Sequence, residues 1–406
     1  MNILFLTLLK VENINERNIY TDLMRCLKKR GHDIYIVTPR EKKFGLESQY
    51  VFEDDIHILK VKIGNITKCG MIEKGISTLN IEKRYKKAIK KNISNVKIDL
   101  VIYSTPPITF AKVVEYVKER DDSKSYLLLK DIFPQNAVDL GMMSQVGVKS
   151  IIYKYFRNKE KRLYELSDNI GCMSPANREY VIKHNKKINP DIVSVCPNSI
   201  EVLDMSVTES EREEMRKKYN IPNDKIIFVY GGNLGKPQGI DFIFECIKTQ
   251  KNNEEVFFLI VGSGTEYEKL EKYISDEPQD NVKLMSQIPK DDYDRMVGSC
   301  DIGLIFLDHR FTIPNFPSRL LSYMQAKLPV FVVTDPNTDI GQIVTDNKFG
   351  WWCESNNAKE FSRLVDTIVS SDIKEMGEIA YKYISDHYDV SQSCDVMFKD
   401  LKINNS

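Results

Sequence analysis

The chain alternates short apolar runs with longer amphipathic stretches over most of its length. An apolar run between two helical stretches is typical of a parallel strand that is buried on both faces of a sheet. This pattern predicts strands at 3–8, 33–38, 59–63, 100–103, 126–130, 169–173 and 192–196, and again at 226–230, 257–261, 282–284, 302–305 and 330–333. We therefore expect an α/β protein with two doubly wound domains.

The domain boundaries follow from the same pattern. In the first half, helices are predicted at 18–30, 81–92, 109–120, 150–167 and 176–184. We place the first domain at 1–200 and the second at 201–385, with the charged stretch 204–219 as a helical bridge. The tail has helical patterns with no strand between them. Its last part, 386–406, is expected to be a closing helix that packs back on the first domain.

A glycine-rich turn follows the first predicted strand of the second domain. Residues 228–239 read Phe-Val-Tyr-Gly-Gly-Asn-Leu-Gly-Lys-Pro-Gln-Gly and lead into an amphipathic helix. Glycine lets the backbone approach a ligand closely, and the first N–H groups of a helix attract a phosphate. A second strand, small turn and helix follow at 257–270. The two units predict a nucleotide-type ligand at the carboxyl ends of parallel strands, although ordinary strand–helix corners share this pattern.

A cation lies at the start of another predicted helix, near 318–327. Ser318 is a good candidate for the N-cap, which puts Arg319 in the first turn. A cation in that turn opposes the helix dipole. The placement becomes favourable if an anion binds beside it, and the alternative is an ordinary surface arginine.

The composition limits the class of protein. Eight cysteines are scattered without a Cys-x-x-Cys pair, and five histidines have no metal-ligand spacing. We expect buried free thiols in a reducing compartment, Cys172 and Cys196 among them, and no metal site. The apolar start, 1–9, lacks a basic segment and a cleavage site, so it is predicted to be a strand. No segment is long enough to span a bilayer, which favours a cytoplasmic protein.

Charge is divided unequally between the halves. Residues 1–200 contain 35 Lys and Arg against 23 Asp and Glu, a balance of +12, and residues 201–406 have a balance of −12. Basic tracts lie at 60–97 and 149–164, and the second also contains Ile, Tyr and Phe. This combination favours contact with an anionic membrane surface, and the alternative is two solvated helix faces. The sequence has no nucleic-acid-binding motif, so nucleic acid is not an expected partner.

Together these segments resemble the retaining glycosyltransferases of family four, whose GT-B fold has two Rossmann-like domains facing across a cleft. The resemblance covers nearly the whole chain. It rests on the motifs at 30–39, 131–141, 196–199, 231–239, 261–264 and 317–324. Asp-Ile-Phe-Pro at 131–134 and Pro-Ser-Arg-Leu-Leu at 317–321 look like the branch that includes L-fucosamine transferases of surface-polysaccharide assembly.

The resemblance implies that the second domain binds the donor. The family's diphosphate-binding arginine and lysine are replaced by Asn233 and Gln238, so Lys236 and Arg319 are expected to neutralise the diphosphate. Two glutamates of the family, near the donor sugar and ribose, are replaced by Pro314 and Ser322. The donor base is expected near 287–289. The full set of expected donor contacts is Gly231, Gly232, Asn233, Gly235, Gly262, Ser263, Gly264, Ile288, Ser318, Leu320 and Ser322.

The resemblance also suggests residues for catalysis and acceptor binding. Asp131 follows a predicted strand of the first domain and is expected to contact the acceptor or the donor sugar. The alternative for Asp131 is a capping aspartate. Asn136 and Asn198 are expected at the acceptor side or the cleft. The catalytic set is therefore Asp131, Lys236 and Arg319.

The implied reaction transfers a hexosyl or N-acetylhexosaminyl group from a UDP-sugar to a polyprenyl-diphosphate-linked saccharide, with retention of anomeric configuration. It serves capsule or O-antigen synthesis at the inner membrane face and needs no metal or other cofactor. Two alternatives stay open. One is a sugar-nucleotide 2-epimerase of the same fold, and the other is a non-catalytic sugar-nucleotide-binding subunit, suggested by Pro314 and Ser322.

Overall fold

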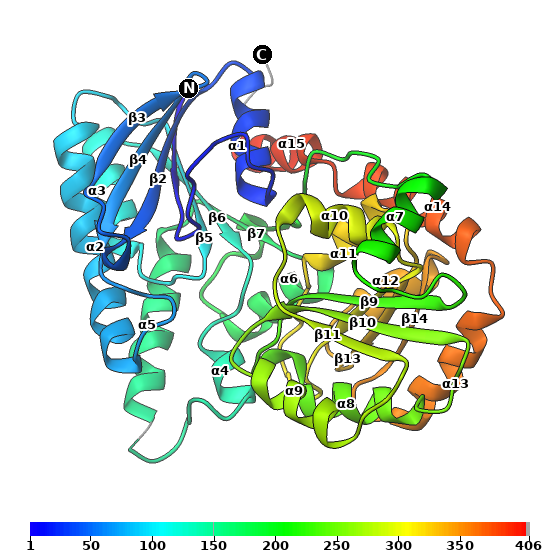
Figure 1. Ribbon diagram of the computed structural model, residues 1–406. Helices are drawn as coiled ribbons and strands as arrows, with labels where there is room; N and C mark the ends of the chain where they lie inside the picture. Colours follow the sequence, from blue (N-terminus) through cyan, green and yellow to red (C-terminus); the bar gives the residue numbers. More distant parts are fainter. Residues whose placement is uncertain (149, 403–406) are drawn as a thin grey trace. The chain divides into compact units, whose positions relative to one another are not determined.

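The computed structural model describes residues 1–148 and 150–402. The described chain forms two compact units, each built on its own sheet (Figure 1). Unit 1 comprises Met1–Glu201 and the segment from Val390 onward, and unit 2 is Val202–Asp389. The chain therefore leaves unit 1 after residue 201 and returns at residue 390, beside the boundaries placed from the sequence.

Unit 1 contains an eight-stranded sheet with the order β3-β4-β2-β1-β5-β6-β7-β8. All neighbouring strands are parallel except β3 and β4, which are antiparallel. The strands are β1 (Asn2–Leu6), β2 (Asp33–Glu41), β3 (Gln49–Glu53), β4 (Ile56–Ile63), β5 (Leu100–Thr105), β6 (Lys124–Leu129), β7 (Asn169–Cys172) and β8 (Val193–Val195).

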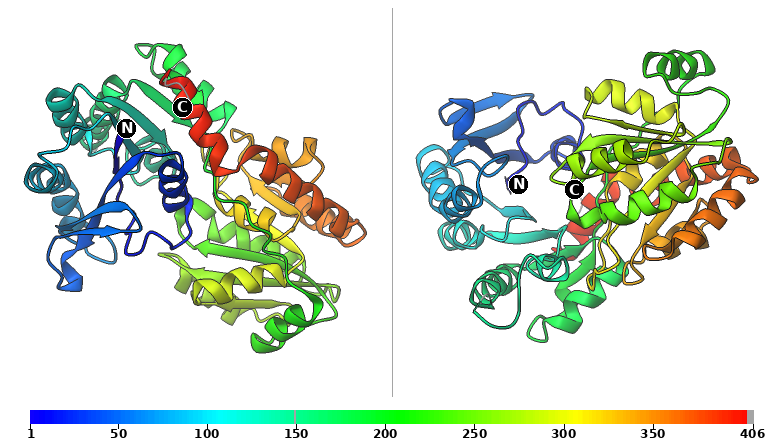
Figure 2. Two further views of the ribbon diagram at one scale, coloured as in Figure 1. Left: turned by 90° about the horizontal axis from the view of Figure 1, so that it is seen from above. Right: turned by 60° about the horizontal axis from the view of Figure 1, so that its bottom comes forward.

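Helices pack in two groups on the unit 1 sheet. One group is α2, α3 and α5, in which α3 contacts both others, and the second pairs α1 with α15 (Figures 1 and 2). The second group buries an apolar core with β1, in which Phe5, Leu27 and Met397 are fully enclosed. The helices are α1 (Ile19–Lys29), α2 (Met71–Asn92), α3 (Ala111–Asp121), α4 (Gln135–Asp139), α5 (Ser150–Leu166), α6 (Pro175–His184) and α15 (Val390–Asp400).

Unit 2 contains a six-stranded parallel sheet with the order β11-β10-β9-β12-β13-β14. Its strands are β9 (Ile226–Asn233), β10 (Val256–Ser263), β11 (Val282–Met285), β12 (Ile302–Phe306), β13 (Val330–Thr334) and β14 (Gly350–Glu354). Its helices are α7 (Glu209–Lys218), α8 (Ile240–Thr249), α9 (Tyr267–Asp276), α10 (Lys290–Gly298), α11 (Arg319–Gln325), α12 (Ile340–Asp346), α13 (Ala358–Val369) and α14 (Ile373–His387).

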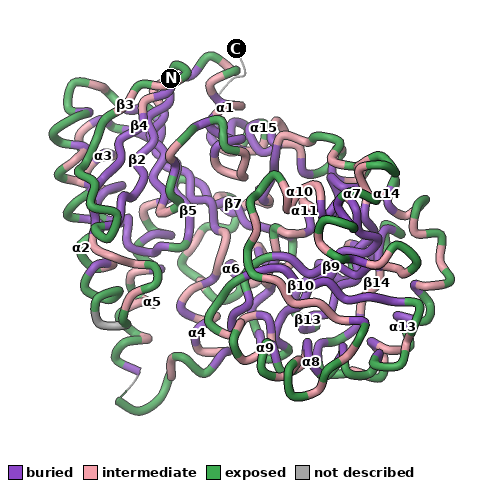
Figure 3. Tube along the Cα trace, viewed as in Figure 1, coloured by how far each residue is buried: buried purple, intermediate pink, exposed green. Residues whose placement is uncertain are grey.

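The four inner strands of unit 2, β10, β9, β12 and β13, are buried along most of their length, as Figure 3 shows. On one face, α8, α9 and α13 enclose a core in which Phe258 and Phe331 pack on either side of Phe361. Helices α7, α10, α11 and α14 form a second contacting group. Strands β9 and β10 continue past this core as a pair through Asn233 and Ser263, and this extension carries the glycine-rich turn.

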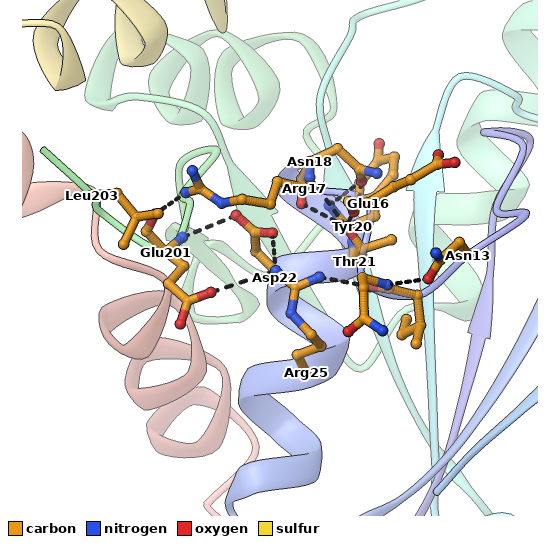
Figure 4. A network of polar contacts seen from close by, with 12 residues as sticks. Asn13, Glu16, Arg17, Asn18, Tyr20, Thr21, Asp22, Arg25, Glu201 and Leu203 are labelled. Carbon is orange, nitrogen blue, oxygen red and sulfur yellow. Dashed lines mark hydrogen bonds and ion pairs between the residues drawn. The ribbon is translucent and has the colours of Figure 1, made fainter. Parts of the chain in front are cut away.

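Polar contacts on α1 hold the end of unit 1 where the chain departs. The backbone N–H of Glu201 donates to the Asp22 carboxylate at 3.0 Å, and Arg25 lies between the carboxylates of Asp22 and Glu201 (Figure 4). The returning chain joins the same place, because the N–H of Val390 donates to the carbonyl of Ile200 at 2.9 Å. The two passages of the chain are thus fixed side by side at the edge of unit 1.

Two strands were not predicted from the sequence, and one helix was predicted too short. β3 makes the unit 1 sheet mixed, which corrects the expectation of parallel strands throughout. Its pattern is mostly exposed, so it lacks the continuous apolar run used to find the others. β14 pairs with β13 at the edge of unit 2. α2 begins at Met71, ten residues before its first predicted residue, and most of residues 73–80 in these first turns are exposed.

The eight cysteines are free thiols, and the prediction that Cys172 and Cys196 are buried is confirmed. The sulfur atoms of Cys26 on α1 and Cys394 on α15 lie 3.2 Å apart. Among residues 1–148 and 150–402, no helix is both long enough and apolar enough to cross a membrane.

Candidate functional site

The glycine-rich turn of unit 2 differs in detail from the predicted strand–turn–helix. β9 continues through Gly231, Gly232 and Asn233, and a 3-10 turn over Lys236–Gln238 precedes α8. Gly232 has φ +123°, a conformation that side chains disfavour. A Cβ on Gly262 would lie 1.9 Å from the carbonyl oxygen of Gly232, so only glycine permits this close pairing. The glycines are therefore needed where the two strands extend toward a pocket.

A pocket of about 510 Å³ opens at these strand ends. Its volume is within the range of small-molecule sites. Two cationic side chains contribute to its wall, whereas none of the lining residues is Asp or Glu. The lining residues are Gly231, Gly232, Asn233, Val261, Gly262, Ser263, Gln287, Ile288, Lys290, Tyr293, Arg319 and Ser322. The composition of this wall favours an anionic ligand.

Arg319 is the most unusual of these residues. Its guanidinium lies 4.2 Å from the centre of the Tyr230 ring, and its Nη1 is buried with no hydrogen-bond partner. No carboxylate in the described ranges forms an ion pair with it. Burial works against its charge, but the neighbouring Tyr230 and Tyr323 hold the pKa of Arg319 above its ordinary value. A buried donor without an acceptor is costly, so this nitrogen is suited to a ligand oxygen.

Three tyrosines hold the pocket wall together. The Tyr323 hydroxyl accepts from the N–H of Gly231 and donates to the carbonyl of Leu304, both at 3.1 Å. The Tyr230 hydroxyl donates to the carbonyl of Asn233 at 2.7 Å. The Tyr293 hydroxyl fills the space where a Cβ on Gly231 would lie. Burial raises the pKa of all three phenols, so they stay neutral near pH 7 and do not cancel the charge of Arg319.

The structure brings together most of the predicted donor residues and leaves others apart. Those that line the pocket are Gly231, Gly232, Asn233, Gly262, Ser263, Ile288, Arg319 and Ser322. Five others, Gly235, Lys236, Gly264, Ser318 and Leu320, are not part of that wall.

The five residues outside the wall have other surroundings. The N–H of Gly235 donates to the Gln238 side chain at 3.0 Å, and the Gly264 backbone packs closely on Leu234. Lys236 is exposed on the 3-10 turn, and Leu320 is fully buried. Ser318 is at the N-cap of α11, but its side chain makes no capping hydrogen bond. α11 is a short helix, Arg319–Gln325, and the Arg319 guanidinium is the charged side chain in its sequence.

Gln238 and Pro314 are two of the positions at which this chain departs from the family pattern. The Gln238 side-chain oxygen accepts from Asn233 at 3.1 Å as well as from Gly235, which braces the turn. Pro314 is buried. Gln238 therefore helps to fix the conformation of the turn that contains Asn233 and Gly235.

Lys290 and Tyr293 line the pocket but were not singled out from the sequence. Both lie on α10, which has ordinary helical periodicity. The only signal was their position just after the segment 287–289, where the resemblance placed the donor base. Tyr230 and Tyr323 looked like core aromatics, because periodicity does not show which way a ring hydroxyl points.

In unit 1, Asp131 follows β6 and Asn136 lies on α4. The Asn136 amide donates to both carboxylate oxygens of Asp131, at 2.9 and 2.8 Å. Burial raises the pKa of Asp131 to about 6. The N-cap position of α4 is Pro134, so the alternative of a capping aspartate is wrong for this helix. The two residues expected to contact sugars are thus in direct contact with each other.

Asn198 lies near residue 201, where the chain leaves unit 1. It lines a cavity of about 10 Å³ with Lys130, Ser199 and Ser393, which has room for no more than a water molecule. The Lys130 amine donates to the Cys196 carbonyl at 3.2 Å, and burial lowers its pKa to about 8. Asn198 lines this small cavity, whereas Asn136 is not part of its wall.

No group of three or more His, Cys, Asp or Glu side chains with metal-binding geometry occurs in the part of the chain that the structure describes.

Comparison with known proteins finds similarity to glycosyltransferases. Residues 211–384 match the model of the family described as glycosyl transferases group 1. A probable glycosyltransferase, WbjE of Pseudomonas aeruginosa, is 24% identical over 296 residues, which cover 71% of each chain. WcaI of Escherichia coli K12, a putative colanic acid biosynthesis glycosyl transferase, is 22% identical over 61% of this chain and 60% of its own length.

Solved structures share the fold over the whole chain. Sucrose-phosphate synthase from Thermosynechococcus elongatus superposes with a TM-score of 0.77 at 13% identity, covering 98% of each chain. The Anabaena protein HepE in complex with UDP-glucose gives a TM-score of 0.69 at 13% identity, covering 99% of each chain. The chain therefore has the GT-B fold with two Rossmann-like domains, and residues 211–384 within its second domain are similar to group 1 glycosyltransferases.

Proposed function

We propose that this protein transfers a sugar from a UDP-sugar to a lipid-linked saccharide acceptor with retention of anomeric configuration. The group 1 glycosyltransferase match and the bacterial relatives support glycosyl transfer in glycan synthesis. The observation that carries the proposal is the partly buried Arg319, whose charge meets no carboxylate and whose Nη1 has no partner at a pocket without acids. A nucleoside diphosphate supplies the oxygens that such a guanidinium binds.

In the proposed reaction, negative charge accumulates on the leaving diphosphate as the glycosidic bond breaks. Arg319 stabilises this charge most strongly in the transition state, because its position is set in advance by Tyr230. The glycine backbone at 231–233 lets the diphosphate approach without a side chain in the way. Lys290 adds a second positive charge at the wall.

Retention is proposed to follow from front-face attack, in which the leaving phosphate takes up the proton of the acceptor hydroxyl. This route needs no protein nucleophile, so Pro314 and Ser322 in place of glutamates are compatible with activity. It also needs no metal ion or other cofactor. The proposed transferred group is a hexosyl or N-acetylhexosaminyl unit.

The proposed donor is supported by HepE, which has the same fold and whose structure contains UDP-glucose. Unit 2 is proposed to be the donor domain. Unit 1 is proposed to bind the acceptor, with Asp131 and Asn136 as the polar pair that meets a sugar hydroxyl. Asp131 has a pKa of about 6, so above that pH it is a carboxylate that can accept a hydrogen bond from the sugar hydroxyl.

The proposed pathway is bacterial surface-polysaccharide synthesis, in an enzyme that works peripherally at the inner face of the cell membrane. WcaI is described as a colanic acid biosynthesis enzyme, which supports the pathway. The basic balance of +12 in residues 1–200 supports contact with anionic lipid that carries the acceptor. Whether the product belongs to a capsule or to an O-antigen depends on the acceptor.

A donor-binding and transfer experiment tests the proposal. Calorimetry with UDP alone should show binding that Arg319→Ala reduces and Arg363→Ala leaves unchanged, since Arg363 pairs with Glu360 on the surface of α13. Incubation with a panel of UDP-sugars and polyprenyl-diphosphate-linked saccharides should then give a lengthened glycan. An epimerised donor would instead support the 2-epimerase, and UDP binding without turnover would support the non-catalytic subunit.

A further inference from the structure

Unit 1 exposes a group of large apolar side chains near the start of α5. Met142, Val146, Val148, Ile151, Ile152 and Tyr155 are between 43% and 86% exposed. The loop between α4 and α5 is exposed for most of its length (Figure 3). Single exposed apolar residues are common, but such a run in one segment marks a surface that contacts something else.

The start of α2 adds to this surface. Ile76 and Leu79 are 59% and 53% exposed. Glu82 of α2 forms an ion pair with Lys159 of α5 at 3.2 Å, which ties the two helices together. Ile76 and Ile152 lie six and seven residues before these partners, or roughly 10 Å along each helix.

The two apolar ends lie at the same edge of the sheet. α2 follows β4, and α5 precedes β7, both of which are parallel to β1 and β6 through the sheet. A helix that joins parallel strands begins near their carboxyl ends. Ile76, Leu79 and the start of α5 therefore project at the carboxyl edge, where unit 1 also holds Asp131.

Exposed cations lie on the same two helices as the apolar residues. α2 contains seven Lys and Arg against two acids, and Lys83, Arg84, Lys87, Lys90 and Lys91 are exposed. Its two acids are engaged, Glu82 with Lys159 and Glu73 with Asn65. On α5, Lys154 and Lys161 are also exposed. Lys149 lies outside the described residues.

We infer that this surface, residues 142–148 and 150–155 with the exposed face of α2, docks on an anionic lipid bilayer. Protein interface cores are depleted in lysine, whereas an interfacial helix combines Lys and Arg with Ile, Val and Tyr. Val146, Val148, Ile151 and Ile152 enter the headgroup region, and the α2 lysines meet anionic headgroups. The inference rests on the proposed function, because docking of this surface brings the lipid-linked acceptor to the carboxyl edge of the unit 1 sheet, which holds Asp131 and Asn136.

Co-sedimentation with vesicles tests the inference. The full chain is mixed with vesicles of phosphatidylcholine alone or with about one third phosphatidylglycerol, and we expect at least about ten-fold tighter binding to the anionic vesicles. Val148→Asp with Ile151→Asp should weaken binding to anionic vesicles by about ten-fold or more. Leu203→Asp, a matched change at an exposed leucine of unit 2, should leave binding unchanged.

A charge variant separates the two contributions. Lys87→Gln with Lys91→Gln should reduce binding to anionic vesicles roughly 30-fold, at about 1 kcal/mol per cation, and leave binding to neutral vesicles unchanged. Calorimetry with UDP reports folding and the donor site independently of any lipid, so its failure would count against the proposed function and not against the docking surface.

Three results would overturn the inference. One is equal binding of the wild type to both kinds of vesicle, and another is wild-type binding by the Val148→Asp, Ile151→Asp variant. The third is a dimer that this variant dissociates in solution while the wild type binds no vesicles, which would assign the surface to a second copy of the chain.

Discussion

The carboxyl edges of the two sheets hold buried charge in opposite ways. In unit 2, Arg319 lies against the face of Tyr230 and meets no acid among the described residues. In unit 1, Asp131 is partly buried, receives two hydrogen bonds from Asn136 and has a pKa raised to about 6. A guanidinium keeps its charge at every physiological pH, whereas this carboxyl gains or loses its charge near neutrality.

The difference indicates two kinds of task. A permanent cation beside an acid-free pocket suits an anion that is always charged, such as a diphosphate. A carboxyl that is ionised above a pKa of about 6 suits hydrogen bonding to a neutral sugar hydroxyl. Variants at each edge should therefore respond differently to charge, to pH and to the loss of an aromatic face.

The largest effect is expected for Arg319→Ala. Removing the main charge-stabilising group of a leaving diphosphate should lower kcat/KM for sugar transfer by about 10²–10³-fold. Arg319→Lys should restore little, because an ammonium cannot stack flat on Tyr230. Arg363→Ala serves as the matched surface control. Activity of Arg319→Ala within about three-fold of wild type would remove the basis of the comparison.

The next effect is expected for Asp131→Asn, and its signature is the pH profile. Sugar transfer by the wild type should rise between about pH 5 and about pH 7 as Asp131 ionises, and the residual activity of Asp131→Asn, about 10²-fold lower, should lack this rise. The neighbouring titratable groups are Lys130 and Glu160, so Lys130→Met and Glu160→Gln check that the limb belongs to Asp131. If the activity of Asp131→Asn still rose between about pH 5 and about pH 7, the ionisation of another group would be responsible for the rise.

The pH dependence of folding stability is a second test of Asp131, because the raised pKa fixes the direction of the effect. Its folded pKa of about 6 is above the ordinary 3.8, so the folded state binds the proton more tightly than the unfolded state. That contribution is complete below the ordinary pKa and is lost as pH rises through about 6. Asp131→Asn should therefore raise the Tm relative to wild type at about pH 8, with a smaller gain at about pH 4.

Much of the fold could be predicted because the strands are apolar runs between helices. The twelve predicted strands all correspond to strands of the two sheets. β3 was missed because only Val51 and Glu53 are even partly buried, so its pattern lacks an apolar face. β14, Gly350-Trp-Trp-Cys-Glu, is too short and mixed to stand out from a loop.

The site was predictable only in part, because sequence gives the strand ends but not the direction of each side chain. Seven of the eleven expected donor contacts line the pocket together with Arg319 of the catalytic set, since the glycine turns mark the ends of β9 and β10. Arg319 was noticed for a dipole argument, yet the structure shows that a tyrosine face accommodates its charge. Tyr230, Tyr293 and Lys290 could not be found, because ordinary periodicity hides a residue that points toward a pocket.

An intermediate effect is expected for Tyr230, which we treat as a positioning residue for Arg319. Tyr230→Leu removes the aromatic face and should weaken UDP binding by about ten-fold, whereas Tyr230→Phe keeps the face and should stay within about three-fold. Phe331→Leu, at a buried ring that packs on Phe361, controls for lost core packing. It should lower the Tm without changing UDP affinity. Equal losses in the Leu and Phe variants would mean that the Tyr230 hydroxyl, bonded to Asn233, matters more than the ring.

The smallest effect is expected for Lys236→Ala, and it tests where the diphosphate lies. Lys236 is exposed on the 3-10 turn and is not part of the pocket wall, whereas Lys290 lines it. An exposed lysine interacts weakly with a charge through water, so Lys236→Ala should reduce kcat/KM by no more than about five-fold. Lys290→Ala should cost more, about ten-fold. A loss from Lys236→Ala as large as that from Arg319→Ala would place the phosphates over the 3-10 turn, outside the acid-free pocket.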